Sequence, residues 1–462
     1  MQESFQFEGI KGYFAGLAPA AVILFSLPFI LLLAGLAILP LAFPHFWENN
    51  RNKAIVSIGL GLPIAGFFLY HDWHTLANTA LDYAAFLSLL SALFIISGGI
   101  HIRGSFAGLP VVNTLFLLIG ALLANFVGTT GASMLMIRPL IRANKARHHK
   151  SHIIIFFIFI VSNCSGLLTP LGDPPLFLGF LRGVDFSWTL RLWREWLLVV
   201  GSLLAIFYFL DHYWFSREHL HIKDVLIKNK EYVSERFGVE GGHNFLFLTA
   251  VVALILFSGY AVYPLKGEPI FDEPFGAVIS KLVQIVGMLV AAFLSYKLTA
   301  KNTHERNHFG FGPIIEVAVL FAGIFMSMTP VLIILETQGH KLGVNHPWQY
   351  FWMAGGLSSF LDNAPTYLTF TSLAKGALQL GGEGLKELML HSTGAIYLAA
   401  VSCGAVMMGA NTYIGNGPNF MVKAIAEEQN VKMPSFFGYM LWSATFLIPL
   451  FLVVTFFFFR NA

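Results

Sequence analysis

The stretch Asn163 to Phe177, NCSGLLTPLGDPPLF, interrupts what is otherwise a membrane-spanning helix, since SHIIIFFIFIVS precedes it. It holds three prolines, two glycines and Asp173. Proline removes a backbone donor, and a carboxylate near the bilayer centre costs at least about 2.5–3.5 kcal/mol. The second half of the chain carries a related stretch, NTYIGNGPNF at Asn411 to Phe420, again between apolar runs. Two broken helices at corresponding places in two halves indicate a transporter's binding site.

The composition predicts a polytopic helical membrane protein. The chain has 462 residues, of which 56% are hydrophobic and 11% charged, and its mean hydropathy is +0.69. Soluble proteins carry about 25% charged residues. Apolar runs of 18 or more residues recur along the chain and are continuous rather than alternating, which favours spanning helices over a β-barrel. The run at 17–43 is interpreted as the first span and not as a cleaved signal peptide.

The predicted fold class is all-α, with two re-entrant hairpins among the spans. The hairpins are predicted at about 108–142 and 347–374, because each region has two apolar arms around a polar tip, which must be surrounded by protein or by a water-filled cavity. The two cysteines form neither a disulfide framework nor a metal-ligand spacing. The predicted spans are 17–43, 53–70, 83–102, 152–182 (broken), 195–214, 244–264, 276–298, 313–334, 395–422 (broken) and 435–459.

The order of three spans, a hairpin, a broken span and a span occurs twice. The hairpin tips Phe126–Thr130 and Phe360–Ala364 align, as do the breaks Gly172–Phe177 and Gly415–Phe420. Each series has five spans, an odd number, so two tandem copies have opposite orientations and form an inverted repeat. The predicted domains are a first repeat at 1–214, a cytoplasmic linker at 215–243 and a second repeat at 244–462.

The positive charges support a topology with both termini outside. If the basic run Arg138–Lys150 is cytoplasmic, 18 of the 28 Lys and Arg residues lie on that side, in agreement with the positive-inside rule. Arg182, Arg191 and Arg194 lie on the other side. The expected location is the inner (cytoplasmic) membrane, as a multi-pass protein.

Asp173 and Asp362 are the principal candidate ion-binding residues, because each lies in a polar interruption. A carboxylate can hold a proton or a cation at the same oxygens, so one group can exchange the two ions. The alternative is that each aspartate caps an adjoining half-helix.

Neutral side chains and backbone near the breaks supply further oxygens, which hard cations such as Na⁺ prefer. The alternative for any one of the side chains is interhelical hydrogen bonding, worth only about 0.6 kcal/mol on average in membranes. The candidates are Gly172, Thr129, Thr130, Ser133, Asn163, Thr169, Asn363, Thr366, Asn411, Thr412, Asn416 and Asn419.

These motifs resemble those of the ion transporter superfamily. GLLTPLGDPPLF and GNGPNF are similar to its two glycine-proline breaks, and VGTTGAS and FLDNAPT are similar to its hairpin tips. The nearest branch is that of NhaD-like sodium/proton antiporters and citrate transporters. The resemblance implies a homodimer, with a scaffold and a transport domain in each protomer and elevator-like alternating access. It implies Na⁺ at the tips and breaks, here at Thr129, Thr130, Gly172, Asp173, Asp362, Asn363 and Asn416.

The sequence departs from the anion-carrier pattern, and this decides between two functions. The first tip has Gly-Thr-Thr instead of Ser-Asn-Thr, and Asp173 replaces a neutral residue. A carboxylate there repels a di- or tricarboxylate, so we expect a Na⁺(Li⁺)/H⁺ antiporter, with a Na⁺-coupled citrate or dicarboxylate symporter as the alternative. A channel is less favoured, because inverted repeats with hairpins are typical of carriers.

No enzymatic role is expected, because the sequence lacks HExxH, GxSxG and GxGD-type motifs. The expected partners are the lipid bilayer, small ions and a second copy of the chain, without nucleic acid. No cofactor is expected beyond the transported Na⁺ and H⁺.

Overall fold

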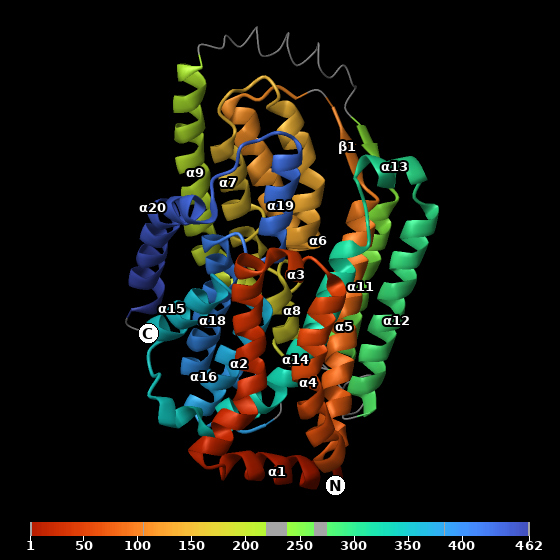
Figure 1. Ribbon diagram of the computed structural model, residues 1–462, viewed down its shortest axis with the longest axis vertical. Coiled ribbons are helices and arrows are strands. Elements are labelled where there is room, and N and C mark those ends of the chain that lie inside the picture. The colour runs from red at the N-terminus through yellow and green to blue at the C-terminus, as the bar shows by residue number, and fades with distance from the viewer. Residues whose placement is uncertain (1, 105, 219–237, 263–274, 383, 461–462) are drawn as a thin grey trace.

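The computed structural model describes residues 2–104, 106–218, 238–262, 275–382 and 384–460. Within these ranges, nine helices are long and apolar enough to cross a membrane. Most of the long helices lie roughly parallel in Figure 1, while α1 (Gln2–Ala15) lies across one end of the bundle. The predicted class, an all-α polytopic membrane protein, is confirmed.

The first half of the chain follows the predicted order of elements. Its elements are α2 (Pro19–Ala42), α3 (Pro44–Trp47), α4 (Asn50–His71), α5 (Trp73–Gly98), β1 (His101–Arg103), α6 (Pro110–Ala143), α7 (Ser151–Ile160), the 3-10 turn η1 (Cys164–Leu167), α8 (Pro174–Leu181), the 3-10 turn η2 (Trp188–Leu192) and α9 (Trp193–Arg217). Of the predicted linker, residues 219–237 lie outside the described ranges.

The second half contains a comparable series. Its elements are β2 (Gly238–Glu240), α11 (Asn244–Val262), α12 (Phe275–Leu298), α13 (Lys301–Arg306), α14 (Gly312–Gln338), η3 (Gly339–Leu342), α15 (Pro347–Ser358), α16 (Asn363–Ala377), α17 (Lys386–Leu390), α18 (Ser392–Met408), η4 (Gly409–Asn411), α19 (Gly417–Glu428), α20 (Phe436–Val454) and the π-helical turn η5 (Thr455–Phe459).

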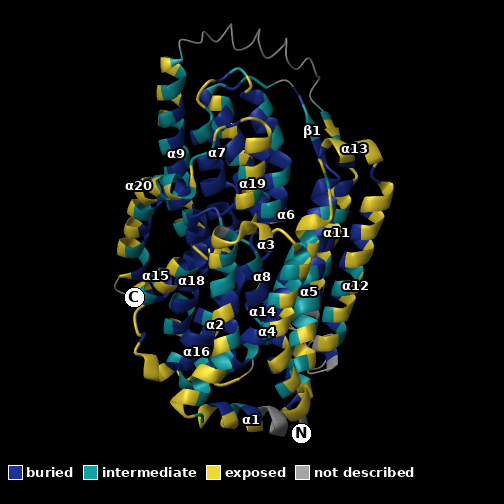
Figure 2. Ribbon diagram, in the orientation of Figure 1, coloured by how far each residue is buried: buried dark blue, intermediate teal, exposed yellow. Residues whose placement is uncertain are grey.

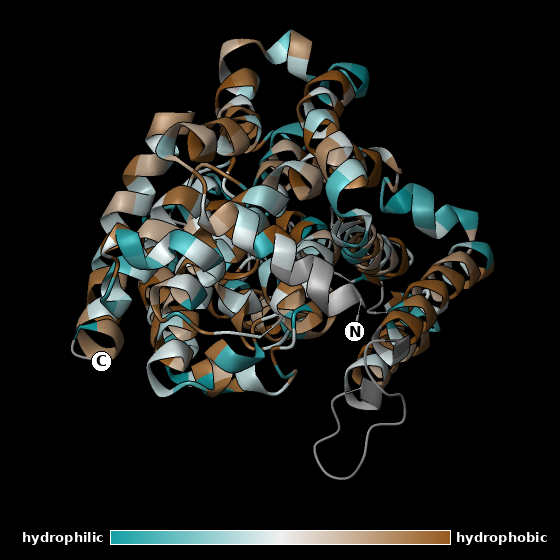
Figure 3. Cartoon of the chain, turned by 90° about the horizontal axis from the view of Figure 1, so that it is seen from below, coloured by the Kyte–Doolittle hydropathy of each residue, from teal (hydrophilic) through white to brown (hydrophobic). Residues whose placement is uncertain are grey.

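Burial separates an inner group of helices from a lipid-facing group. In α7, every residue from His152 to Ile160 is buried, which is typical of a short helix that is apolar on all sides and lies in a protein core. Figure 2 shows the same dark colour along much of α6, α8 and α18, whereas α12 carries many exposed positions. Exposed residues on α12 include Leu282, Val286 and Phe293. Figure 3 shows predominantly hydrophobic colour on such peripheral helices, as a lipid-facing surface requires.

Helix α6 is a hairpin and not one straight span. Gly128 has φ 76° and ψ 157°, outside the helical region, where glycine is favoured. The side chains of Asn113 and Asn144, near the two ends of α6, donate to each other over 3.0 and 2.7 Å. A straight helix would separate residues 31 positions apart by about 46 Å. The chain therefore reverses at Gly128, with the two arms side by side.

A buried group of charges holds the base of this hairpin. The Arg147 guanidinium donates to Asp211 Oδ1 at 2.8 Å, to Glu218 Oε2 at 2.9 Å and to the Gly108 carbonyl at 3.0 Å. His152 Nε2 lies 2.9 Å from Asp211 Oδ1, and Asn113 donates to Asp211 Oδ2 at 2.8 Å. The side chains of Arg147, Asp211 and Glu218 are at most 1% exposed. This buried charge cluster joins both arms of α6 to α7 and α9.

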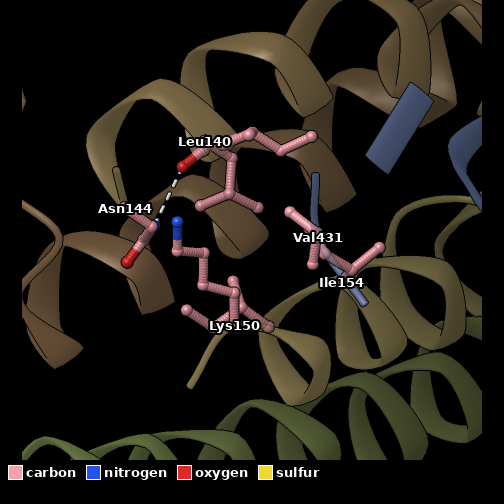
Figure 4. A pocket seen from close by; sticks show the side chains of 7 residues that line it. Leu140, Asn144, Lys150, Ile154 and Val431 are labelled. Carbon is pink, nitrogen blue, oxygen red and sulfur yellow. Dashed lines mark hydrogen bonds between the residues drawn. The ribbon is translucent and has the colours of Figure 1, made fainter. Parts of the chain in front are cut away.

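A small pocket beside the hairpin base is mainly apolar. Figure 4 shows Asn144 and Lys150 at its polar side, with Asn144 hydrogen-bonded to Leu140. No acidic residue lines it, so it does not resemble the carboxylate-containing site predicted from the sequence.

The second hairpin consists of α15 and α16, with a tip at residues 359–362. Asp362 is the N-cap of α16, and its Oδ1 accepts a hydrogen bond from the Ala364 amide at 3.0 Å. The capping role considered for Asp362 from the sequence is therefore observed.

Two of the ion pairs that connect helices of the first half to helices of the second occupy matching positions. Lys53 on α4 contacts Glu316 on α14 at 2.7 Å, and Lys281 on α12 contacts Asp82 on α5 at 2.7 Å. In each pair the lysine lies on the second predicted span of one half and the acid on the third predicted span of the other. The halves are thus joined by the same combination of helices twice.

Strand β1 pairs antiparallel with β2 at the end of the molecule that carries the linker. His101 of β1 is buried, and its Nδ1 lies 2.7 Å from Asn307 Oδ1. Burial lowers the pKa of His101 and the charges of Arg142 and Arg306 lower it further, against the Asn307 hydrogen bond and the Glu240 charge, which raise it.

Acidification is expected to destabilise this end of the molecule through His101. The unfolded chain binds a proton below pH about 6.5, whereas the folded chain keeps the ring neutral to lower pH. The unfolded state then holds more protons, so stability falls as the pH drops below this value. In detergent, the decrease in thermal stability between pH 7.5 and 5.5 should be smaller for His101→Gln than for the wild type. The exposed His148→Gln variant is the control, and equal slopes for all three proteins would contradict the expectation.

Candidate functional site

Both spans are interrupted because glycine and proline occupy corresponding positions in the two halves. The first break, residues 161–173, separates α7 from α8, and the second, residues 409–416, separates α18 from α19. Each following half-helix has proline in its first turn. A Cβ on Gly172 would lie within 3.0 Å of the Gly166 backbone, and a Cβ on Gly415 would clash similarly with Gly409. Only glycine permits this close crossing of the backbone within each break.

A threonine attaches each hairpin tip to the break of the same half. Thr169 Oγ1 donates to the Asn125 carbonyl at 2.5 Å, and Thr412 Oγ1 donates to the Ser359 carbonyl at 2.5 Å. Each threonine stands four residues before the last residue of its break, which is Asp173 in the first half and Asn416 in the second. Likewise, the residue with the accepting carbonyl stands four residues before Thr129 in the first half and before Asn363 in the second. The two contacts thus have the same register in both halves. Thr169 and Thr412 are both predicted ion ligands, and in the structure each donates its hydroxyl proton to a carbonyl.

Removing either threonine hydroxyl is expected to slow transport by loosening a tip. In Thr169→Val or Thr412→Val, the side chain keeps its shape but cannot donate a hydrogen bond to the carbonyl of the hairpin tip. Leaving a buried carbonyl without its donor costs about 1–3 kcal/mol of stability. We expect weaker ion binding and a lower transport rate in both variants, measured with purified protein in proteoliposomes. Thr445→Val is the control, because Thr445 is exposed on α20 and its hydroxyl bonds only within its own helix. Wild-type rates in both buried variants would show that these contacts do not position the tips.

Asp173 is the point where all four polar interruptions meet. Its Oδ1 accepts from Thr129 Oγ1 of the first tip at 2.8 Å and lies 3.4 Å from Asn416 Nδ2 of the second break. Its Oδ2 accepts from Asn363 Nδ2 of the second tip. The Thr129 amide also donates to the Gly172 carbonyl at 2.8 Å. Asp173 is only 1% exposed, so its carboxylate is shielded from solvent in this conformation.

The surroundings of Asp173 are polar but carry no positive side chain. In the described ranges, no Lys, Arg or His forms an ion pair with it, and its side-chain hydrogen-bond partners are a hydroxyl and two amides. Asp362 is near enough to interact electrostatically with Asp173, although its own oxygen caps α16. Two negative charges that lack a cationic partner favour a bound cation or proton.

Two amide oxygens, one in the second hairpin and one in the second break, are buried without hydrogen-bond partners. These are Asn363 Oδ1 and Asn411 Oδ1, among the described residues. Asn363 already uses its Nδ2 on Asp173, and Asn411 donates to Ser359 Oγ at 2.9 Å. Buried acceptors normally find a donor, and a hard cation such as Na⁺ binds such oxygens. The donor set fits a cation.

Asparagine amides connect the two breaks directly. Asn163 Nδ2 donates to Asn419 Oδ1 at 2.6 Å, and Asn416 Nδ2 lies 3.3 Å from Asn163 Oδ1. Asn419 in turn donates to the carbonyls of Gly409 and Thr412, both at 2.9 Å. Asn163 and Asn419 therefore fix the breaks to each other, and Asn416 reaches both Asn163 and Asp173.

The remaining predicted site residues make local contacts. Ser133 Oγ lies 2.8 Å from Ser162 Oγ, and Thr366 Oγ1 donates to the Asp362 carbonyl at 3.1 Å. Thr130 adjoins Thr129 in the first tip. Sequence reasoning missed Asn125 and Ser359, whose side chains also bind the breaks: Asn125 Oδ1 accepts from the Leu168 amide at 3.0 Å, and Ser359 Oγ from Asn411. Each stands four residues before a predicted ion ligand of its hairpin tip, and this shared spacing could have identified both residues from the sequence.

A buried carboxylate between two interrupted helices and two hairpin tips, within a bundle of membrane-spanning helices, defines a membrane transporter. The chain belongs to the family described as "Putative citrate transport", whose model matches residues 19–459. The predicted resemblance to the citrate-transporter branch of the ion transporter superfamily is thereby confirmed. A search of curated proteins finds no match.

Proposed function

We propose that this transporter is a secondary Na⁺(Li⁺)/H⁺ antiporter in which Asp173 binds either the cation or the proton. The observation that carries the proposal is the neutral environment of Asp173. Its carboxylate has three neutral donors and no cationic partner among the described residues, and the unpaired Asn363 Oδ1 lies on the amide that contacts it. A buried charge without a counter-ion calls for a cation or a proton.

The exchange follows from competition for one carboxylate. Na⁺ binds to the ionised Asp173 and takes neutral oxygens of the tips and breaks as further ligands. A proton on Asp173 removes the charge that holds the ion, so the two cannot be bound there together. Asp362 adds a second negative charge and is a second candidate for exchange. An antiporter needs only this mutual exclusion and access to one side of the membrane at a time.

We propose that the predicted inverted repeats provide alternating access, in which the site opens to one side of the membrane at a time. The proposal keeps an elevator-like movement of a transport domain against a scaffold, a homodimeric assembly and a location in the inner membrane, as the superfamily resemblance implies. The two ion pairs that join α4 to α14 and α5 to α12 support a scaffold built from both halves.

The alternative function is Na⁺-coupled symport of citrate or a dicarboxylate, and the family description favours it. The N-termini of α8 and α19 would then bind the anion. Asp173 is the N-cap of α8, however, and places a carboxylate where the anion would bind. This repulsion makes the antiporter the better supported function.

Transport in proteoliposomes distinguishes the two functions. For an antiporter, a Na⁺ gradient moves protons in the opposite direction, without any carboxylate present. Na⁺ should also raise the thermal stability of the purified protein, and this effect should weaken as the pH falls because protons compete for Asp173. If Na⁺ instead drives uptake of labelled citrate or succinate without proton exchange, the symporter is correct.

A further inference from the structure

Glu195, in the first turn of α9, is a second membrane-embedded carboxylate that the site around Asp173 does not use. Its Oε2 is buried and has no hydrogen-bond partner among the described residues. Arg194 is its neighbour in sequence and interacts with it electrostatically. Glu195 also lies near enough to the fully buried thiol of Cys403 on α18 to interact with it. A carboxylate oxygen that is buried and unpaired is rare in folded proteins, and acidic groups within membrane spans indicate functional sites.

The start of α9 is attached directly to the first break. Trp196 Nε1 donates to the Ser165 carbonyl at 3.0 Å, and Thr189 Oγ1, in η2, donates to the Leu168 carbonyl at 2.9 Å. Both carbonyls belong to the unwound chain between α7 and α8. Glu195 immediately precedes Trp196, one of these two donors, so the backbone that carries Glu195 lies next to the break.

The other side of the same break faces Asp173. Cys164 precedes Ser165, and Asp173 lies near enough to interact electrostatically with its thiol. Cys164 Sγ approaches the Met407 carbonyl at 3.8 Å, and Met407 stands one turn after Cys403 on α18. Glu195 and Asp173 therefore flank one irregular segment, whose unwound backbone offers carbonyl oxygens to a proton or a water molecule.

The partial exposure of Glu195 provides an entry to this route. Helix α9 ends at Arg217, next to the linker, and Glu195 lies at the opposite end. Its side chain is only partly exposed, and its Oε2 is buried, so the carboxylate lies between the outside of the bundle and the packed interior.

We propose that Glu195 is the group through which protons pass between water and Asp173. This inference rests on the proposed antiporter function. The proton moves from water to the Glu195 carboxylate and then to the Asp173 carboxylate as Na⁺ leaves. Glu195 returns to its ionised form, and no other species is consumed.

The test separates proton movement from Na⁺ movement in the full-length protein in proteoliposomes. Exchange of ²²Na⁺ for Na⁺ at equal pH on both sides needs no proton, whereas Na⁺-driven proton flux does. Glu195→Gln keeps the size of the side chain but cannot carry a proton in this way. We expect its proton flux to fall at least about tenfold, most strongly at high pH, while ²²Na⁺ exchange stays within about twofold of the wild type. Glu195→Asp should recover part of the flux.

The control variant is Asp185→Asn, because Asp185 is an exposed acid in the loop between α8 and η2. Wild-type proton flux in Glu195→Gln would overturn the inference while the antiporter function stands. An equal loss of both fluxes would also overturn it, because it would indicate a structural role. Absence of Na⁺-driven proton flux in the wild-type protein would refute the antiporter function and this inference with it.

Discussion

Replacing Asp173 with asparagine is expected to abolish Na⁺-driven proton movement, lowering the rate at least about 100-fold. Asparagine keeps the size of the side chain but carries no charge and takes up no proton at accessible pH. The variant should also lose the stabilisation by Na⁺ that the wild-type protein shows. Because a buried charge is removed, its thermal stability without Na⁺ should equal or exceed that of the wild type. Proton flux in proteoliposomes and thermal unfolding in detergent measure the two effects.

Asp362→Asn is the matched comparison for this prediction. Asparagine is as good an N-cap as aspartate, so α16 should remain intact. If Asp362 serves only as a cap, exchange persists in this variant; if it also exchanges ions, the rate falls while stability is kept. Proton flux that survives in Asp173→Asn would refute the central role of Asp173, whatever the result for Asp362.

Removing the acid from the buried charge cluster is expected to produce the largest loss of stability. In Asp211→Asn, the Arg147 guanidinium stays buried and loses its ionic contact at 2.8 Å, and His152 loses its carboxylate partner. Breaking one partner of a buried ion pair costs about 3–5 kcal/mol. We expect a marked decrease in the thermal unfolding temperature in detergent, together with lower yield of folded protein.

Two comparisons test whether the loss comes from the unpaired charge. The triple variant Asp211→Leu, Arg147→Met and Glu218→Gln should be less destabilised than Asp211→Asn, because it leaves none of the three charges buried without a partner. Lys423→Gln removes an exposed pair with Glu427 on α19 and should change stability by less than about 1 kcal/mol. Equal effects of Asp211→Asn and Lys423→Gln would contradict the prediction.

The interruptions of the helices could be predicted from the sequence because their causes are local. Gly166, Gly172 and the prolines after Asp173 together disfavour a continuous helix over a short stretch, and the apolar runs around them have the length of spans. The predicted hairpin at 108–142 agrees with α6, Pro110–Ala143, because an apolar region too long for one span needs a reversal. The domain boundaries and the inversion of the halves stay predictions.

The contacts that build the site could not be predicted with the same certainty because they join distant residues. Thr169 and Asn125 are 44 positions apart, and Asn163 and Asn419 are 256 positions apart. No local pattern distinguishes a threonine that binds a carbonyl from one that binds an ion. Arg147 belongs to a basic loop in the sequence, yet it is buried because Asp211 and Glu218 reach it from α9 and the residue that follows it.

The division of the site between both halves has a consequence for biosynthesis. Among the described residues of the first half, Asp173 has Thr129 as its one side-chain hydrogen-bond partner; Asn363 and Asn416 are made some 190 and 243 residues later. While the ribosome is still producing the second half, the inserted first half holds a carboxylate without most of its ligands. The nascent first half must keep this group hydrated or sheltered until the second half enters the bilayer. Assembly of the ion site is therefore a late step of membrane insertion, and a chain truncated before Asn416 cannot complete it.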